Sequence, residues 1–132
     1  MINIFLRMKE SKLKREYKDI DKEEMNKLVR QGAVLVDIRS PQEYKEGHLN
    51  SAISLPEYEI KNKCETVLED KNKIIIVYCT SGQRSKKAQK RLQQKGYINV
   101  YNLLGGIEKY WDFYFSMLKY DHKNIIRWKN NE

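Results

Sequence analysis

The sequence predicts an α/β domain with a central, mostly parallel five-stranded sheet and helices on both faces. Two apolar runs of strand length, residues 33–37 and 74–78, have the continuous hydrophobicity of strands that are buried on both sides of a parallel sheet. Segments with helical spacing lie between the predicted strands, and the connections are short. Such alternation produces right-handed crossovers, which cover both faces of the sheet.

The predicted domain begins with a short strand at residues 17–20. Asp21 and Glu24 then form the pattern of a capping box, in which Asp21 bonds forward into the helix and Glu24 bonds back. The helix that they start is expected to end at Gly32, because glycine is the usual residue just past a helix. The strand at residues 33–37 follows.

A second capping box, Ser40 with Glu43, comes after this strand, and Pro41 occupies the first helical position. The short helix is expected to end near Gly47, and residues 52–56 form the third predicted strand. A helical stretch is therefore expected on each side of this strand.

The second half of the domain repeats the pattern around the most hydrophobic strand. A helix at residues 58–68 precedes that strand, and a basic helix at residues 85–95 follows it. Gly96 ends the basic helix, and residues 100–102 form the fifth strand.

The chain divides into three parts. Residues 16–111 hold all the predicted strands and form one domain, which suits a chain of 132 residues. Residues 1–15 are a basic N-terminal leader, and residues 112–132 are an aromatic and basic C-terminal extension. We expect this extension to pack on the domain, with an interface to a partner as the alternative.

Composition indicates a globular cytoplasmic protein. The longest apolar stretch, residues 74–79, is too short to cross a bilayer, and the N-terminus lacks the pattern of a signal peptide. The two cysteines, Cys64 and Cys79, form neither a disulfide framework nor a metal-ligand spacing. A free thiol without disulfides is typical of a reducing compartment. We therefore expect no metal and no cofactor.

The positive charge is concentrated in one segment. The formal net charge is +8, and residues 71–107 contain eight basic and no acidic residues. The remainder of the chain is therefore neutral overall. This distribution favours a small anion at one place over a nucleic-acid or membrane surface, with a solvated helix face as the alternative.

Cys79 lies where the central predicted strand ends, a few residues before the basic helix. In parallel sheets, ligands bind beyond the carboxyl ends of the strands. The first amides of a helix have no partners within it and favour an anion, so this loop suits a thiolate, the reactive form of cysteine. We therefore predict that Cys79 is a nucleophile. A buried, inert cysteine is the alternative.

Several segments, in this order, resemble the rhodanese-like domain family. They are residues 36–44, 47–49, 52–56, 79–85 and 103–111. One departure is visible. The family usually has Pro-Gly where this chain has Asn50 and Ser51, for which we expect a local change in the turn.

The resemblance implies a sulfurtransferase in which Cys79 carries a persulfide from a small anionic donor such as thiosulfate to cyanide, a thiol or a protein, with ping-pong kinetics. The substrate-binding residues that it implies are Thr80, Ser81, Gly82, Gln83, Arg84 and Ser85. Their amides would surround the persulfide, and Gly82 would allow the backbone to turn inward. Arg84 would bind sulfonate oxygens, with an ion pair to an acidic neighbour as the alternative.

Four further residues carry chemistry that bears on the prediction. Asp37 and Arg39, at the end of a buried strand, are interpreted as supporting residues, and Arg39 is expected to pair with Glu43. His48 is expected to stabilise a turn rather than to act as a base. Cys64 has no basic cluster around it, which disfavours a role as a resolving cysteine.

Two other functions remain open from the sequence. A cysteine-dependent phosphatase of the same fold has five residues between cysteine and arginine, whereas four separate Cys79 from Arg84, which favours sulfur. A non-catalytic binding or regulatory module of this fold commonly lacks the cysteine. Nucleic acid and membranes are not expected as partners.

Overall fold

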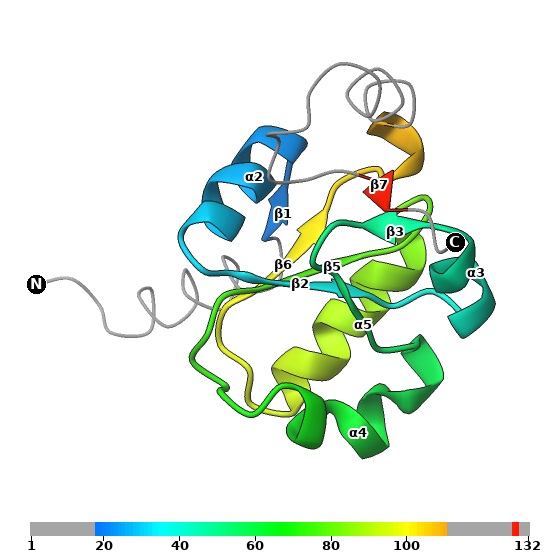
Figure 1. Cartoon of the computed structure of the whole chain (residues 1–132). Coiled ribbons are helices and arrows are strands. Elements are labelled where there is room, and N and C mark those ends of the chain that lie inside the picture. Colours follow the sequence, from blue (N-terminus) through cyan, green and yellow to red (C-terminus); the bar gives the residue numbers. More distant parts are fainter. Residues whose placement is uncertain (1–17, 111–127, 130–132) are drawn as a thin grey trace, which may run out of the picture.

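The computed structural model describes residues 18–110 and 128–129, and it has the predicted α/β architecture (Figure 1). Five strands form one sheet in the order β1-β6-β5-β2-β4, and every neighbouring pair is parallel. Their bounds are β1 Asp19–Ile20, β2 Val34–Asp37, β4 Ile53–Ser54, β5 Ile75–Tyr78 and β6 Val100–Leu103. The strand that precedes Cys79, β5, is the central strand of the sheet.

Helices cover both faces of this sheet, as the alternating pattern predicts (Figure 1). The helices are α2 Lys22–Arg30, α3 Pro41–Glu46, α4 Ile60–Val67 and α5 Gln83–Gln94, with short 3-10 turns at η1 Glu57–Glu59 and η2 Glu108–Tyr110. Helices α4 and α5 lie together on one face, and α2 lies on the other. Within the described ranges, no helix is both long enough and apolar enough to span a membrane.

The side chains of β5 build a core on each face of the sheet. Ile75 and Val77 pack with residues of α4 and α5, whereas Ile76 and Tyr78 pack with residues of α2. All four are at most 1% exposed, and each buried aliphatic side chain contributes about 1.5–3 kcal/mol. Cys79 continues the alternation, so its thiol is placed on the α4 and α5 face.

Capping explains where the helices near the sheet edge begin. Ser40 caps α3 as a capping box, because its hydroxyl accepts from the Glu43 amide and the Glu43 carboxylate accepts from the Ser40 amide. At α2, the Asp21 carboxylate accepts from the Glu24 amide at 2.8 Å. The predicted starts of α2 and α3 are therefore confirmed, whereas α4 begins at Ile60 and α5 at Gln83, two residues from their predicted starts.

A second, two-stranded sheet was not predicted. Strand β3, His48–Leu49, pairs antiparallel with β7, Trp128–Lys129. The predicted leader, residues 1–15, and residues 112–127 and 130–132 of the predicted extension lie outside the described residues. The choice between packing and an interface for the extension therefore stays a prediction.

The turn that departs from the family pattern has an unusual backbone. Ala52 N donates to Leu49 O at 3.0 Å, which closes a turn with Asn50 and Ser51 at its centre. Ser51 has a φ of 67°, and among the described residues it is the one non-glycine with positive φ. At this turn position positive φ normally selects glycine, so the chain tolerates strain there.

We expect Ser51→Gly to stabilise the protein by about 0.5–1 kcal/mol, because the left-handed conformation costs a serine roughly 1–2 kcal/mol and the added freedom of the unfolded chain offsets part of the gain. Urea unfolding at unchanged m value measures the difference. Ser81→Gly, at an exposed residue without positive φ, is the control and should bring no gain. An equal gain in both variants would contradict the explanation.

Candidate functional site

The Cys79 thiol lies at the N-terminus of α5, where two backbone amides point at it. Gly82 N is 3.0 Å from Sγ and Ser85 N is 3.3 Å from it. The Ser85 hydroxyl oxygen lies 3.3 Å from the same sulfur. Amide donors in this arrangement stabilise negative charge on the atom that they face. The side chain of Cys79 is 0% exposed, so the sulfur is enclosed by its own loop.

The turn at Gly105 and Gly106 is followed by two backbone amides that donate to carbonyls of the Cys79 loop. Ile107 N donates to Cys79 O at 3.1 Å, and Glu108 N donates to Thr80 O at 2.9 Å. With these two carbonyls fixed on one side, the amides that follow them turn toward the sulfur. The tight turn at Gly105 and Gly106 therefore shapes the Cys79 loop.

Gly82 is required where the loop enters the helix. Its φ is 95°, a conformation that side chains rarely adopt, and it is the N-cap of α5. A Cβ there would lie 3.2 Å from Gly105 N, so the space beside it is also narrow. The predicted role of Gly82 in the inward turn is consistent with both observations.

Asn102 orients the Ser85 hydroxyl, and the sequence reasoning missed this contact. The Asn102 amide nitrogen donates to Asp19 Oδ1 at 3.2 Å and lies 3.4 Å from Gly82 O. Both partners are acceptors, so Asn102 Oδ1 faces Ser85 and accepts its hydroxyl at 2.5 Å. The Ser85 hydroxyl, which lies 3.3 Å from the Cys79 sulfur, is therefore held in place by Asn102.

Arg84 forms an ion pair with Glu43 of α3. Its Nη1 is 2.8 Å from Glu43 Oε1, its Nη2 is 3.1 Å from Oε2, and Nη2 also donates to Thr80 Oγ1 at 3.2 Å. This is the alternative that the sequence left open for Arg84. Two helices that flank the loop are thereby joined at its mouth. Two other predicted binding residues, Ser81 on the loop and Gln83 at the first position of α5, are exposed.

The Arg84 guanidinium beside Glu43 lowers the pKa of that carboxyl to about 2. Folding therefore gains stability from ionised Glu43 above the ordinary value of 4.5 and loses it as the pH falls toward 2. The wild type should lose unfolding free energy as the pH falls, and we expect this loss to be about 1 kcal/mol smaller in Glu43→Gln. The difference is modest because the Arg84 side chain is 41% exposed and solvent screens the ion pair.

Urea unfolding at several pH values checks this prediction. Glu46→Gln, on the same helix α3, is the matched control and should keep the full acid-induced loss. A Glu43→Gln protein with the wild-type pH dependence would show that the ion pair does not stabilise the fold.

Asp37 and Arg39 form a buried ion pair, and the predicted pairing of Arg39 with Glu43 is wrong. Arg39 Nη2 lies 2.7 Å from Asp37 Oδ2 and also donates to Gly47 O at 2.7 Å. Arg39 precedes the N-cap of α3, so it does not share a helix face with Glu43, whose carboxylate faces Arg84 instead. The Tyr78 hydroxyl donates to Asp37 at 2.9 Å, and burial and this carboxylate raise the pKa of Tyr78. The Tyr78 hydroxyl thus links this pair to β5.

The structure also places His48 and Cys64. The His48 ring stacks on Tyr44 with centroids 3.7 Å apart, and Nδ1 lies 2.8 Å from Tyr44 O, which agrees with a structural role. Cys64 is fully buried on α4 and is free. Among the described residues there is no group of three side chains that could hold a metal ion.

The central strand of this parallel sheet is followed directly by a cysteine, and the cysteine lies at the N-terminus of the next helix. This arrangement defines a class of α/β domains with a cysteine in the loop after the central strand. The chain belongs to the rhodanese-like domain family, whose pattern matches residues 21–112. Fold and sequence pattern thus agree with the predicted family.

Known proteins of two kinds are similar to this chain. It is 40% identical over 89 residues to the tRNA uridine(34) hydroxylase of Buchnera aphidicola, covering 64% of this chain and 28% of that protein. It is 37% identical over 73 residues to the thiosulfate sulfurtransferase PspE of Escherichia coli, covering 55% of this chain and 69% of that protein. The chain therefore spans about a quarter of the hydroxylase's length.

Among solved structures, a rhodanese with anions from E. coli superposes with a TM-score of 0.55 at 34% identity. The superposition covers 58% of this chain and 91% of the other.

Proposed function

We propose that the protein is a sulfurtransferase in which Cys79 carries sulfur from thiosulfate or a similar small anionic donor to a thiophilic acceptor. The observation that carries the proposal is the pair of amides, Gly82 N and Ser85 N, at 3.0 and 3.3 Å from the Cys79 sulfur. Similarity to a thiosulfate sulfurtransferase and to a rhodanese with anions supports the same class of donor.

The reaction has two displacement steps at sulfur. The Cys79 thiolate attacks the outer sulfur of thiosulfate, a sulfur–sulfur bond forms, and sulfite leaves with the electron pair of the broken bond. An acceptor such as cyanide then attacks the outer sulfur of the persulfide, which returns the thiolate and releases thiocyanate. The persulfide is anionic, and the loop amides stabilise it in both steps.

Arg84 lies at the mouth of the loop, so its role in binding thiosulfate can be tested. We expect Arg84→Ala to raise the apparent KM for thiosulfate by about tenfold and to change kcat less, because the guanidinium retains donors beyond those bonded to Glu43 and would bind sulfonate oxygens. Steady-state kinetics with varied thiosulfate measure the split. Lys87→Ala, one helical turn further along α5, is the control. An unchanged KM in Arg84→Ala would remove Arg84 from the binding site.

Hydroxylation of tRNA is the second candidate, because the relatives that share up to 40% identity carry that name. We rank it lower, since those proteins extend far beyond the matched part, which is 28% of the length of the Buchnera protein. Phosphatase activity also ranks lower, because the loop has four residues between Cys79 and Arg84.

The proposal is tested by initial rates of thiocyanate formation over a grid of thiosulfate and cyanide concentrations. Parallel double-reciprocal lines are expected, because sulfite leaves before cyanide reacts. The same preparation is given an aryl phosphate. Turnover of the phosphate ester without thiocyanate formation would reject the proposal in favour of the phosphatase.

A further inference from the structure

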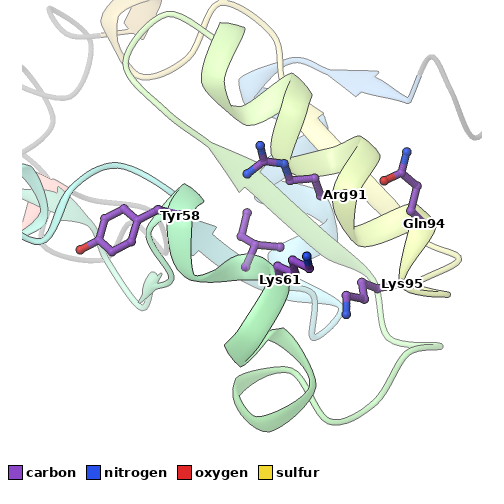
Figure 2. Close-up of a pocket in the computed structure, with 6 residues that line it drawn as sticks. Tyr58, Lys61, Arg91, Gln94 and Lys95 are labelled. Atoms are coloured by element: carbon purple, nitrogen blue, oxygen red, sulfur yellow. The ribbon is translucent and has the colours of Figure 1, made fainter.

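A basic groove lies between the two helices on the Cys79 face of the sheet (Figure 2). Its volume is about 640 Å³, and its lining residues are Tyr58, Ile60, Lys61, Arg91, Gln94 and Lys95. Lys61 projects from α4, whereas Arg91 and Gln94 project from α5. The floor is apolar, since Ile60 is fully buried. Half of the lining side chains are cations.

Two nearby acids offset two of the three cations. Glu57 Oε1 is 3.9 Å from Arg91 Nη1, and Glu65 Oε1 is 3.9 Å from Lys95 Nζ, which places both pairs at the outer limit of ion-pair distance. Among residues 18–110, Lys61 forms no ion pair. The groove therefore carries a net positive charge that is open to solvent.

Helix α5 connects the groove to the reactive sulfur. The helix starts at the Cys79 loop, and Arg84, Arg91 and Lys95 recur at spacings that place them along one side of it. From Ser85 to Lys95 the helix rises about 15 Å. Thiosulfate is far too small to occupy both places. A ligand that uses the groove while it reacts at Cys79 is therefore an extended one.

We propose that this groove, defined by Lys61, Arg91, Lys95 and Tyr58, docks an acidic segment of a protein thiol that takes sulfur from Cys79. The inference deepens the proposed function and rests on it. The Tyr58 side chain is 68% exposed at one end of the groove, and exposed tyrosine and arginine side chains are typical of protein interfaces. Acidic side chains of the partner complement the cations, and the charge match also speeds the encounter.

The transfer step balances without an oxidant. The partner's thiolate attacks the outer sulfur of the Cys79 persulfide, a new sulfur–sulfur bond forms on the partner, and the Cys79 thiolate leaves with the electron pair of the old bond. The outer sulfur lies about 2 Å beyond Sγ, which extends the reactive atom out of its enclosed position. A docked partner needs to bring its thiol only to the mouth of the loop.

Glu57 and Glu65 at the rim favour a protein over nucleic acid. A continuous phosphate backbone would meet these carboxylates with like charge, whereas a protein segment can place its own basic or neutral residues opposite them. Nucleic acid is therefore an outcome that the test must be able to detect.

The test compares two acceptor peptides of about ten residues, long enough when extended to reach from the loop to Lys95. Both begin with the same cysteine; one is rich in glutamate, and the other has glutamine at the same places. Full-length protein is loaded with thiosulfate, freed of excess donor and mixed with each peptide, and sulfur transfer is followed by mass. A second portion of the loaded protein is discharged with cyanide. The ratio of the peptide rate to the cyanide rate is then compared between the two peptides and between the protein variants.

We expect the glutamate peptide to react about tenfold faster than the glutamine peptide at low salt, and about equally fast near 0.5 M salt. Lys61→Glu with Arg91→Glu should abolish this preference. Lys73→Glu with Lys22→Glu changes the net charge equally but away from the groove, and it should keep the preference.

Equal rates for the two peptides in the wild type would overturn the proposal, as would an equal loss in both double variants. An oligoribonucleotide of the same net charge is added as a competitor of the glutamate peptide. If it displaces the peptide at a lower concentration than unlabelled peptide does, the groove binds nucleic acid and the proposal is overturned. Failure of cyanide discharge in the wild type would instead reject the underlying sulfurtransferase function.

Discussion

Replacing Cys79 by serine is expected to lower thiocyanate formation from thiosulfate and cyanide by a factor on the order of 10⁴ or more. A serine hydroxyl does not ionise at neutral pH and cannot form a persulfide. The fold should persist, because the smaller hydroxyl can accept from the amides of Gly82 and Ser85 that now face the sulfur. Initial rates and thermal unfolding of the same preparation separate lost chemistry from lost structure.

Cys64→Ser is the matched control for this change. Cys64 is the other cysteine of the chain and is fully buried on α4, so a hydroxyl there should reduce stability and leave sulfur transfer largely intact. If Cys79→Ser kept a tenth or more of the rate while Cys64→Ser lost it, Cys64 would be the carrier.

Gly106→Ala is expected to cost about 3 kcal/mol of unfolding free energy or more, the largest stability effect among the variants considered. Gly106 has a φ of 63°, and a Cβ there would overlap the carbonyl of Thr80 and lie 2.6 Å from Cys79 O. The overlapping atoms are backbone of the reactive loop, which cannot rotate away as a side chain can. The loop carbonyls would have to move, and the amides that face the sulfur would move with them.

Gly32→Ala supplies the comparison that isolates this overlap. Gly32 also has positive φ, at 99°, but nothing lies within 4 Å of a Cβ built there, so alanine should cost only about 1 kcal/mol. Urea unfolding gives both values, and thiocyanate formation by the folded fraction reports on the loop. Equal costs at the two positions would show that the turn at Gly106 does not press on the Cys79 loop.

Much of the fold could be predicted because its signals are local. The run that became β5 is hydrophobic at every position, as a strand buried on both faces must be, and Ser40 with Glu43 forms the capping box that their spacing predicts. Strands β3 and β7 could not be predicted in the same way. Their pairing joins residues that are 79 and 81 positions apart in the sequence, and no local pattern indicates such a contact.

In the candidate site, too, local features could be predicted from the sequence and long-range contacts could not. Cys79 and the amides of its loop follow from a strand that ends where a helix begins, which is local information. The partners of Arg84 and Ser85 depend on which helix and which strand lie beside the loop: Glu43 is 41 positions away from Arg84, and Asn102 is 17 positions away from Ser85. For Arg39 we expected Glu43, four positions away, but its guanidinium pairs with Asp37, which is two positions away and is buried with it at the end of β2.

The most direct test of the sulfur carrier is the intact mass of the protein after incubation with thiosulfate, before and after cyanide, for wild type, Cys79→Ser and Cys64→Ser. We expect wild type and Cys64→Ser each to gain the mass of one sulfur atom and to lose it to cyanide, and Cys79→Ser to gain none. A cyanide-sensitive sulfur on Cys79→Ser, or none on the wild type, would contradict the assignment of Cys79 as the carrier of sulfur from thiosulfate.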